Sequence, residues 1–101
     1  YMLSGNINAI HILEQNLDKV NWKTLSYNIN AIHILEKNLD KVNWHKLSLN
    51  PNAIHILESV LQHDPDKINW NSLSRNPKAT HILEKYPENI NWKEFAIWSN
   101  L

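Results

Sequence analysis

One phrase of seven residues, Asn-Ala-Ile-His-Ile-Leu-Glu, recurs along this chain, each time followed by a short polar stretch and Asn-Trp. It begins at Asn8, Asn30 and Asn52 and returns in altered form at Lys78. The interval is 22 residues, with one interval of 26. A unit this short cannot bury its own apolar face, so consecutive copies must stack on one another. The repetition predicts a single repeat domain over the whole chain, with copies at residues 6–27, 28–49, 50–75 and 76–97.

The two ends of the chain depart from this pattern. Residues 1–5 align with the half-unit that follows a repeat Trp, which indicates a partial half-repeat and a piece of a longer array. Near the other end, Phe95-Ala96 replaces the Leu-Ser of the earlier copies. A stack needs its exposed core covered at its ends. Residues 98–101 are therefore either a cap, with Trp98 and Leu101 folded over the last layer, or the start of a truncated copy.

The phrase has the periodicity of an amphipathic helix. In two copies Asn-Pro precedes it, which is typical of a helix N-cap and first turn, and this predicts a helix over about residues 29–38 in the second copy. On a helical wheel His33 falls on the polar side. The opposite side is one apolar arc formed by Ala31, Ile32, Ile34 and Leu35.

The remainder of each copy predicts a connector and a second, shorter helix. Pro replaces Leu39 in the last two copies and ends the first helix, after which Val42 turns inward. Asn43 then caps a short turn over residues 44–48, of α or 3₁₀ type. An insertion carried by residues 59–64 lengthens one first helix by about one turn. A β-solenoid would need alternating β-branched residues and glycine corners, and the chain has one Gly, so the prediction is an all-α solenoid of ~22-residue repeats.

Three segments carry a resemblance to a known family. They are Asn-Pro-Asn-Ala-Ile-His-Ile-Leu-Glu at 50–58, Asp-Lys-Ile-Asn-Trp at 66–70 and Leu-Ser-Arg-Asn-Pro at 73–77. Together they resemble the NPNAIHLLE-type short helical repeats of large DNA viruses, and the resemblance covers nearly the whole chain. Here Ile replaces the first Leu of the family phrase, and the first two copies have Asn-Ile-Asn for Asn-Pro-Asn. The resemblance implies an array of short helices and a viral origin, and it implies no catalytic residues and no particular partner.

Composition limits the function further. The net charge is +0 and the pI about 7.2, which disfavours nucleic acid as a partner because phosphate-binding surfaces usually need a basic excess. The chain has no Cys, which excludes disulfides and thiolate metal sites and fits an intracellular protein of the host cytoplasm or the virion. No run of 18 apolar residues is present, so no membrane contact is predicted.

The histidines and tryptophans recur once in every copy. Stacked helices lie about 8–10 Å apart, so neighbouring histidines are poorly placed to share a metal ion, and no HExxH spacing or catalytic triad is present. The sequence therefore predicts a protein without enzymatic activity, metal or cofactor. Each His is expected on a polar-face ladder with a hydrogen bond to a neighbouring loop or Asn, and each Trp as a core wedge whose indole N–H meets a carbonyl. The ladder is His11, His33, His55 and His81, and the wedges are Trp22, Trp44, Trp70 and Trp92.

Partner specificity is expected where the copies differ, because the recurring positions build the stack. The four most variable sets are Tyr27/Leu49/Arg75/Ile97, Lys23/His45/Asn71/Lys93, Thr24/Lys46/Ser72/Glu94 and Gln15/Lys37/Ser59/Lys85. The candidate partner-binding residues are Tyr27, Leu49, Arg75, Ile97, His45 and Lys46. The predicted function is a scaffold for a protein or peptide partner. The alternatives are a helical repeat that reads single-stranded nucleic acid and a structural component of a virus particle that associates end to end.

Overall fold

The computed structural model of the chain describes residues 7–99, with side chains from His11 on. The partial half-repeat predicted at residues 1–5 and the predicted packing of Leu101 lie outside this range. Within it every regular element is a helix, so the all-α prediction is confirmed. None of these helices is long and apolar enough to cross a membrane.

Each copy is a pair of helices joined by a connector. The first helices are α1 (Ile7–Glu14), α3 (Ile32–Lys37), α5 (Ile54–His63) and α7 (Thr80–Lys85). The second helices are α2 (Trp22–Ser26), α4 (Trp44–Leu49), α6 (Trp70–Leu73) and α8 (Trp92–Ser99). Three of the connectors contain a 3₁₀ turn, namely η2 (Leu17–Lys19), η3 (Pro65–Lys67) and η4 (Pro87–Asn89).

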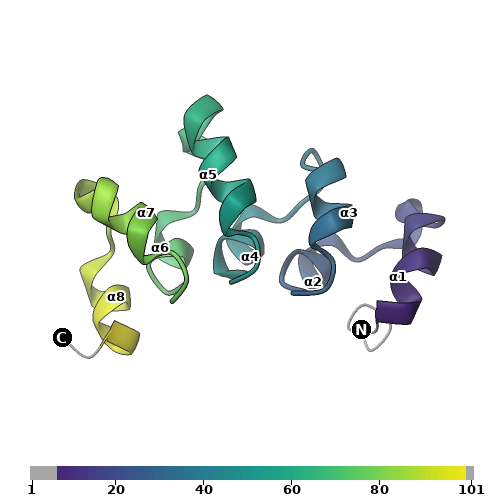
Figure 1. Ribbon diagram of the computed structural model, residues 1–101, viewed down its shortest axis with the longest axis horizontal. Helices are drawn as coiled ribbons and strands as arrows, with labels where there is room; N and C mark the ends of the chain where they lie inside the picture. Colours follow the sequence, from purple (N-terminus) through teal and green to yellow (C-terminus); the bar gives the residue numbers. More distant parts are fainter. Residues whose placement is uncertain (1–6, 100–101) are drawn as a thin grey trace.

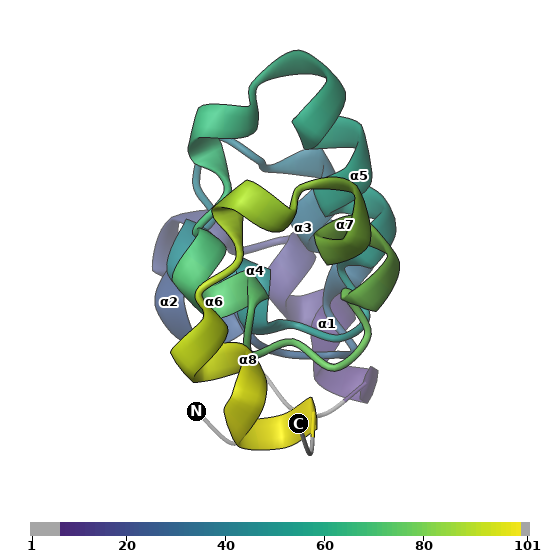
Figure 2. The ribbon, with the colours of Figure 1, turned by 90° about the vertical axis from the view of Figure 1, so that its left-hand side faces the viewer.

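The four pairs follow one another along the longest axis of the molecule, whose extents are 42 × 29 × 16 Å (Figure 1). Seen along the row, the first helices lie on one side and α2, α4 and α6 on the other (Figure 2). Helix α4 contacts both α2 and α6, so these three second helices form a continuous layer through the middle of the row. Equivalent residues of successive copies are thereby brought next to each other.

In the last three copies the first helix begins later than predicted, whereas α1 begins at Ile7, the position equivalent to the predicted start. The helix predicted over residues 29–38 is α3, which begins at Ile32 after Ala31. In the third copy Asn50 and Pro51 form a turn instead of a helix start, because Asn50 O accepts from Ala53 N at 3.1 Å and Asn50 Oδ1 accepts from Asn52 N at 3.0 Å. An Asn side chain suits a helix cap and such an Asx turn equally, and here it forms the turn.

The second helices begin where the sequence predicts. The Oδ1 of Asn43 accepts a hydrogen bond from Lys46 N at 3.0 Å. The Asn before each of the other repeat tryptophans likewise accepts from the backbone N–H of the second residue after that Trp. Of the two helix types left open for this segment, the structure has the α type, and the 3₁₀ turns lie in the connectors. The inserted residues lengthen α5 to 10 residues, against 6 in α3, as predicted, and Leu61 of the added turn is buried.

One apolar core runs through the described copies. Each of the last three copies contributes a fully buried Ala directly before its first helix, for example Ala31, and each of the first three contributes a buried Leu from its second helix, for example Leu47. The repeat tryptophans are predicted to be core wedges, and their side chains are less buried than that prediction requires. Trp22, Trp44 and Trp70 pack against the core while remaining half-buried, and Trp92 is 57% exposed. Each Trp is the first residue of a helix only 4–8 residues long, where the neighbouring copy covers one side of the ring.

Candidate interaction surface and the bonds between copies

A buried serine hydroxyl joins each second helix to the next copy. Ser26 Oγ donates to Trp22 O of its own helix at 2.6 Å and accepts from Asn43 N of the next copy at 2.8 Å. The next two junctions repeat this contact, at 3.2 Å between Asn69 N and Ser48 Oγ and at 2.9 Å between Asn91 N and Ser74 Oγ. The sequence analysis did not single out these serines, although their recurrence after Leu in three copies was a usable signal.

The Asn that opens each turn forms a second joint. Asn50 is fully buried, and its Nδ2 donates to Ser26 O at 3.0 Å and to Asn28 O at 3.2 Å. Asn76 repeats the arrangement on Ser48 O at 3.0 Å and on Asn50 O at 3.1 Å. A buried carbonyl needs a partner, and this amide supplies one to Ser26 O and Ser48 O, whereas Asn28 O and Asn50 O also accept from the backbone N–H of Ala31 and Ala53. The structural role predicted for the recurring Asn therefore extends across copies.

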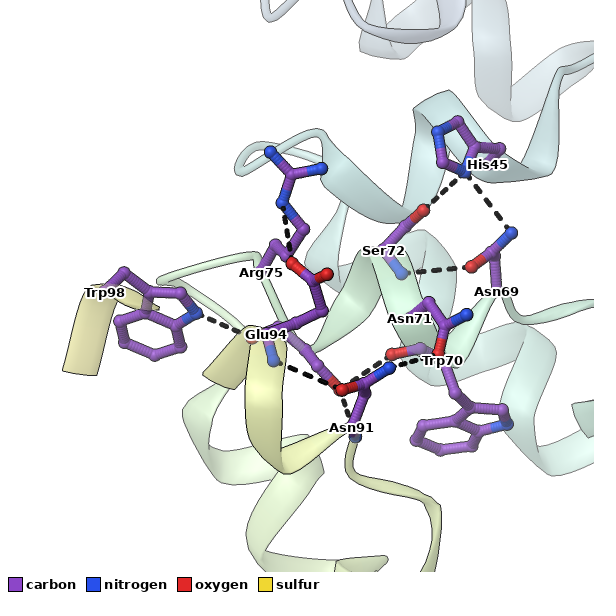
Figure 3. A network of polar contacts seen from close by, with 10 residues as sticks. His45, Asn69, Trp70, Asn71, Ser72, Arg75, Asn91, Glu94 and Trp98 are labelled. Carbon is purple, nitrogen blue, oxygen red and sulfur yellow. Dashed lines mark hydrogen bonds and ion pairs between the residues drawn. The ribbon is translucent and has the colours of Figure 1, made fainter. Parts of the chain in front are cut away.

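Trp98 occupies the position that follows in this series, 22 residues after Asn76. Its indole Nε1–H donates to Ser74 O at 2.6 Å, the carbonyl equivalent to those that Asn50 and Asn76 reach (Figure 3). The ring packs edge-on against Phe95, with centroids 5.0 Å apart. An indole thus replaces an amide as donor, and the two predictions for residues 98–101, a cap or the start of a truncated copy, both stay open.

The histidine ladder is exposed, as predicted, but its partners differ from those predicted. The imidazole Nε2 of His55 bonds the carboxylate of Glu36, and that of His81 lies 3.0 Å from Glu58 Oε2. Each partner is therefore a carboxylate of the preceding copy, not a loop or an Asn. The polar-face geometry places the Glu at the end of the phrase beside the His of the next copy. His11 lies 3.6 Å from Glu14 of its own helix, and His33 is exposed.

These contacts do not assemble a metal site. Across residues 7–99 no three His, Asp or Glu side chains lie close enough to hold one ion. Shallow grooves run between neighbouring first helices, and each joins a Glu of one copy to a Lys of the next, Glu14 with Lys37 and Glu58 with Lys85. This side of the molecule therefore presents alternating opposite charges.

The structure brings three of the four variable sets together. They lie on the second helices and the residue after each, whereas the set Gln15/Lys37/Ser59/Lys85 lies on or beside the first helices. We name the outward side of α2, α4, α6 and α8, with Tyr27 and Arg75, the second-helix face. On it Tyr27 is 53% and Ile97 71% exposed, Arg75 is exposed, and Leu49 and Lys46 are half-buried.

Some variable residues contact the neighbouring copy instead of facing solvent alone (Figure 3). His45 Nδ1 lies 2.7 Å from Ser72 Oγ and 3.4 Å from Asn69 Nδ2. Arg75 Nε lies 3.5 Å from Glu94 Oε2. His45 and Arg75, two of the candidate partner-binding residues, therefore also contact the next copy, and their role in binding a partner stays a prediction.

A similar contact links Asn91 Nδ2 to Asn71 Oδ1 at 2.8 Å.

Comparison of the chain with protein families, with curated proteins and with solved structures found no match. The geometry of the second-helix face therefore carries the inference of function.

Proposed function

We propose that this chain is an α-solenoid of short helical repeats that serves as a non-enzymatic scaffold for a protein or peptide partner. The observation that carries the proposal is the collection of the variable positions on one layer of adjacent helices. The recurring Ser and Asn side chains hold the copies together from within, so the outward positions are free to differ. A continuous surface of differing side chains on a uniform frame is the arrangement by which repeat proteins bind extended partners.

The exposed side chains of the second-helix face suit contact with another polypeptide. Tyr27 and Ile97 are large side chains more than half exposed at opposite ends of the row. Aromatic and apolar residues of this kind form the anchors of protein interfaces. Polar residues such as Lys23 and Asn71 lie beside them, as in the rim of an interface.

Selection from a random peptide library tests the scaffold proposal. We expect peptides selected on the intact chain to lose most of their affinity for a Tyr27→Ala/Ile97→Ala variant. They should bind a His33→Ala/Lys37→Ala variant as they bind the intact chain, because those two exposed residues belong to a first helix. Circular dichroism verifies that both variants remain helical. The proposal fails if no library peptide is enriched, or if both variants bind the selected peptides equally.

A nucleic-acid-binding repeat is the second candidate, because the basic residues Lys23, Lys46 and Lys93 all lie on the second helices in spite of the neutral total. Binding of single-stranded RNA at low salt would support it. The resemblance to viral repeats, an intracellular location and a role in particle assembly stay predictions. For assembly, sedimentation at increasing concentration is the measurement, with growth of the mass as the supporting result.

A further inference from the structure

Charge is unevenly distributed over this electrically neutral chain. The second-helix face carries four cations and one carboxylate, namely Lys23, Lys46, Arg75 and Lys93 with Glu94. The first helices carry the opposite balance, four carboxylates and two lysines, namely Glu14, Glu36, Glu58 and Glu84 with Lys37 and Lys85. Neutrality of the whole therefore conceals a basic face and an acidic face.

The cations of the second-helix face are available to a partner. Lys23 and Lys93 are exposed, and Lys46 is half-buried. Arg75 is the exception, because Glu94 lies beside it at 3.5 Å. The first, second and fourth copies thus each contribute one available cation, and beside these lysines lie the apolar or aromatic side chains of Tyr27, Leu49 and Ile97.

From this arrangement we propose that the second-helix face binds an extended acidic peptide segment in which acidic and apolar residues alternate with the period of the copies. The inference rests on the scaffold function proposed above and names the chemistry of its partner. Opposite charge across an interface guides encounter and sets the register of the partner. A peptide with apolar residues between its carboxylates also covers the side chains that lie between the lysines.

The spacing of the copies fixes the spacing in the partner. Neighbouring packed helices lie about 8–10 Å apart, and an extended chain advances about 3.3 Å per residue. One carboxylate about every third residue therefore meets at most one cation per copy. A peptide of the same composition with its carboxylates gathered at one end can reach only one or two of the four copies.

The same face is less suited to single-stranded nucleic acid. A single strand carries one phosphate for every nucleotide, whereas each copy offers at most one cation. Bases also need exposed aromatic faces on which to stack. In the middle of the row other side chains already contact the Trp rings. Lys67 lies over Trp44 at 5.7 Å, and Tyr86 lies against Trp70 at 5.6 Å.

Synthetic ligands test the inference directly. Three labelled probes are titrated by fluorescence anisotropy: a 12-residue peptide of repeating Asp-Leu-Ser, a peptide of the same composition with all Asp at one end, and an oligouridine of equal length. The proteins are the intact chain, Lys23→Glu/Lys46→Glu, and the matched control Lys37→Glu/Lys85→Glu, which makes the same charge change on the first helices. Glu at the new positions lies in the first turn of α2 and α4, where a carboxylate is favourable, so the variant should fold.

We expect the alternating peptide to bind the intact chain more tightly than the gathered peptide and the oligouridine. Its affinity should fall about five- to tenfold in Lys23→Glu/Lys46→Glu, remain within about twofold in the control, and fall with added salt. Equal binding of the two peptides, an equal loss in the control, or tighter binding of oligouridine overturns the inference. If library-selected peptides still bind this face while the Asp peptides do not, the acidic partner is wrong and the scaffold proposal stands. If neither the library-selected peptides nor the Asp peptides bind, both the acidic partner and the scaffold function are wrong.

Discussion

The side-chain amide of Asn76 bonds residues of the two preceding copies. Because its Nδ2 serves Ser48 O and Asn50 O, and its Oδ1 accepts from Lys78 N, truncation leaves two buried carbonyls without this donor. We predict that Asn76→Ala lowers the free energy of unfolding by about 2–3 kcal/mol in urea denaturation. The control Asn52→Ala removes one exposed bond to Ile29 O and should cost less than about 1 kcal/mol. Equal losses in the two variants would contradict the role assigned to the buried amide.

Trp98 offers a test of donor replacement at one atom. Phe at this position keeps most of the ring and removes the N–H that bonds Ser74 O. We predict that Trp98→Phe destabilises the chain by about 1 kcal/mol, measured by thermal and urea unfolding. Trp92→Phe is the matched control, because that ring is 57% exposed, and its effect should stay within about 0.5 kcal/mol. If the two variants behaved alike, the indole bond would contribute nothing to stability.

The extra turn of helix α5 can be deleted without changing the repeated part of the copy. Deletion of residues 59–62 restores the 22-residue interval and removes Val60 and the buried Leu61. We predict a folded, helical protein that is less stable by about 2–3 kcal/mol, through the loss of this apolar burial. Circular dichroism and urea unfolding measure the two parts of the prediction. A variant without cooperative unfolding would show that the added turn is required for the fold.

The elements also show what sequence reasoning reached and where it stopped. Helical periodicity and the Asn before each Trp are local signals, so the helix pairs and the longer α5 were predictable. The start of α3 was misplaced because an Asn can cap a helix or form a turn, and Asn28 forms the turn, its Oδ1 accepting from Asn30 N at 2.8 Å. The Glu36 partner of His55 belongs to another copy, and helical wheels of single copies do not show it.

For the whole molecule, the position of a copy in the row should set its stability. Leu35, Leu47 and Leu57 of the middle copies are fully buried, whereas α8 contains no buried residue. In stacked repeats each copy gains stability from its neighbours, so a copy with a described neighbour on both sides opens least often. We predict slow amide exchange in α3 to α6 and faster exchange in α1 and α8, measured by hydrogen–deuterium exchange and mass spectrometry. Uniform protection along residues 7–99 would contradict this order.

The contacts of His45 with Ser72 and of Arg75 with Glu94 have a consequence for how such a chain reaches its native state. Tandem units of nearly identical sequence can dock on the wrong neighbour, or exchange with units of another molecule, and become trapped in a misfolded form. The buried Ser bonds are the same at the three described junctions and cannot discriminate among these pairings. Side-chain pairs that differ from junction to junction can discriminate among the pairings, because a misplaced copy would lose its matching partner. Divergence among duplicated units thus guards against misassembly, independently of any binding partner.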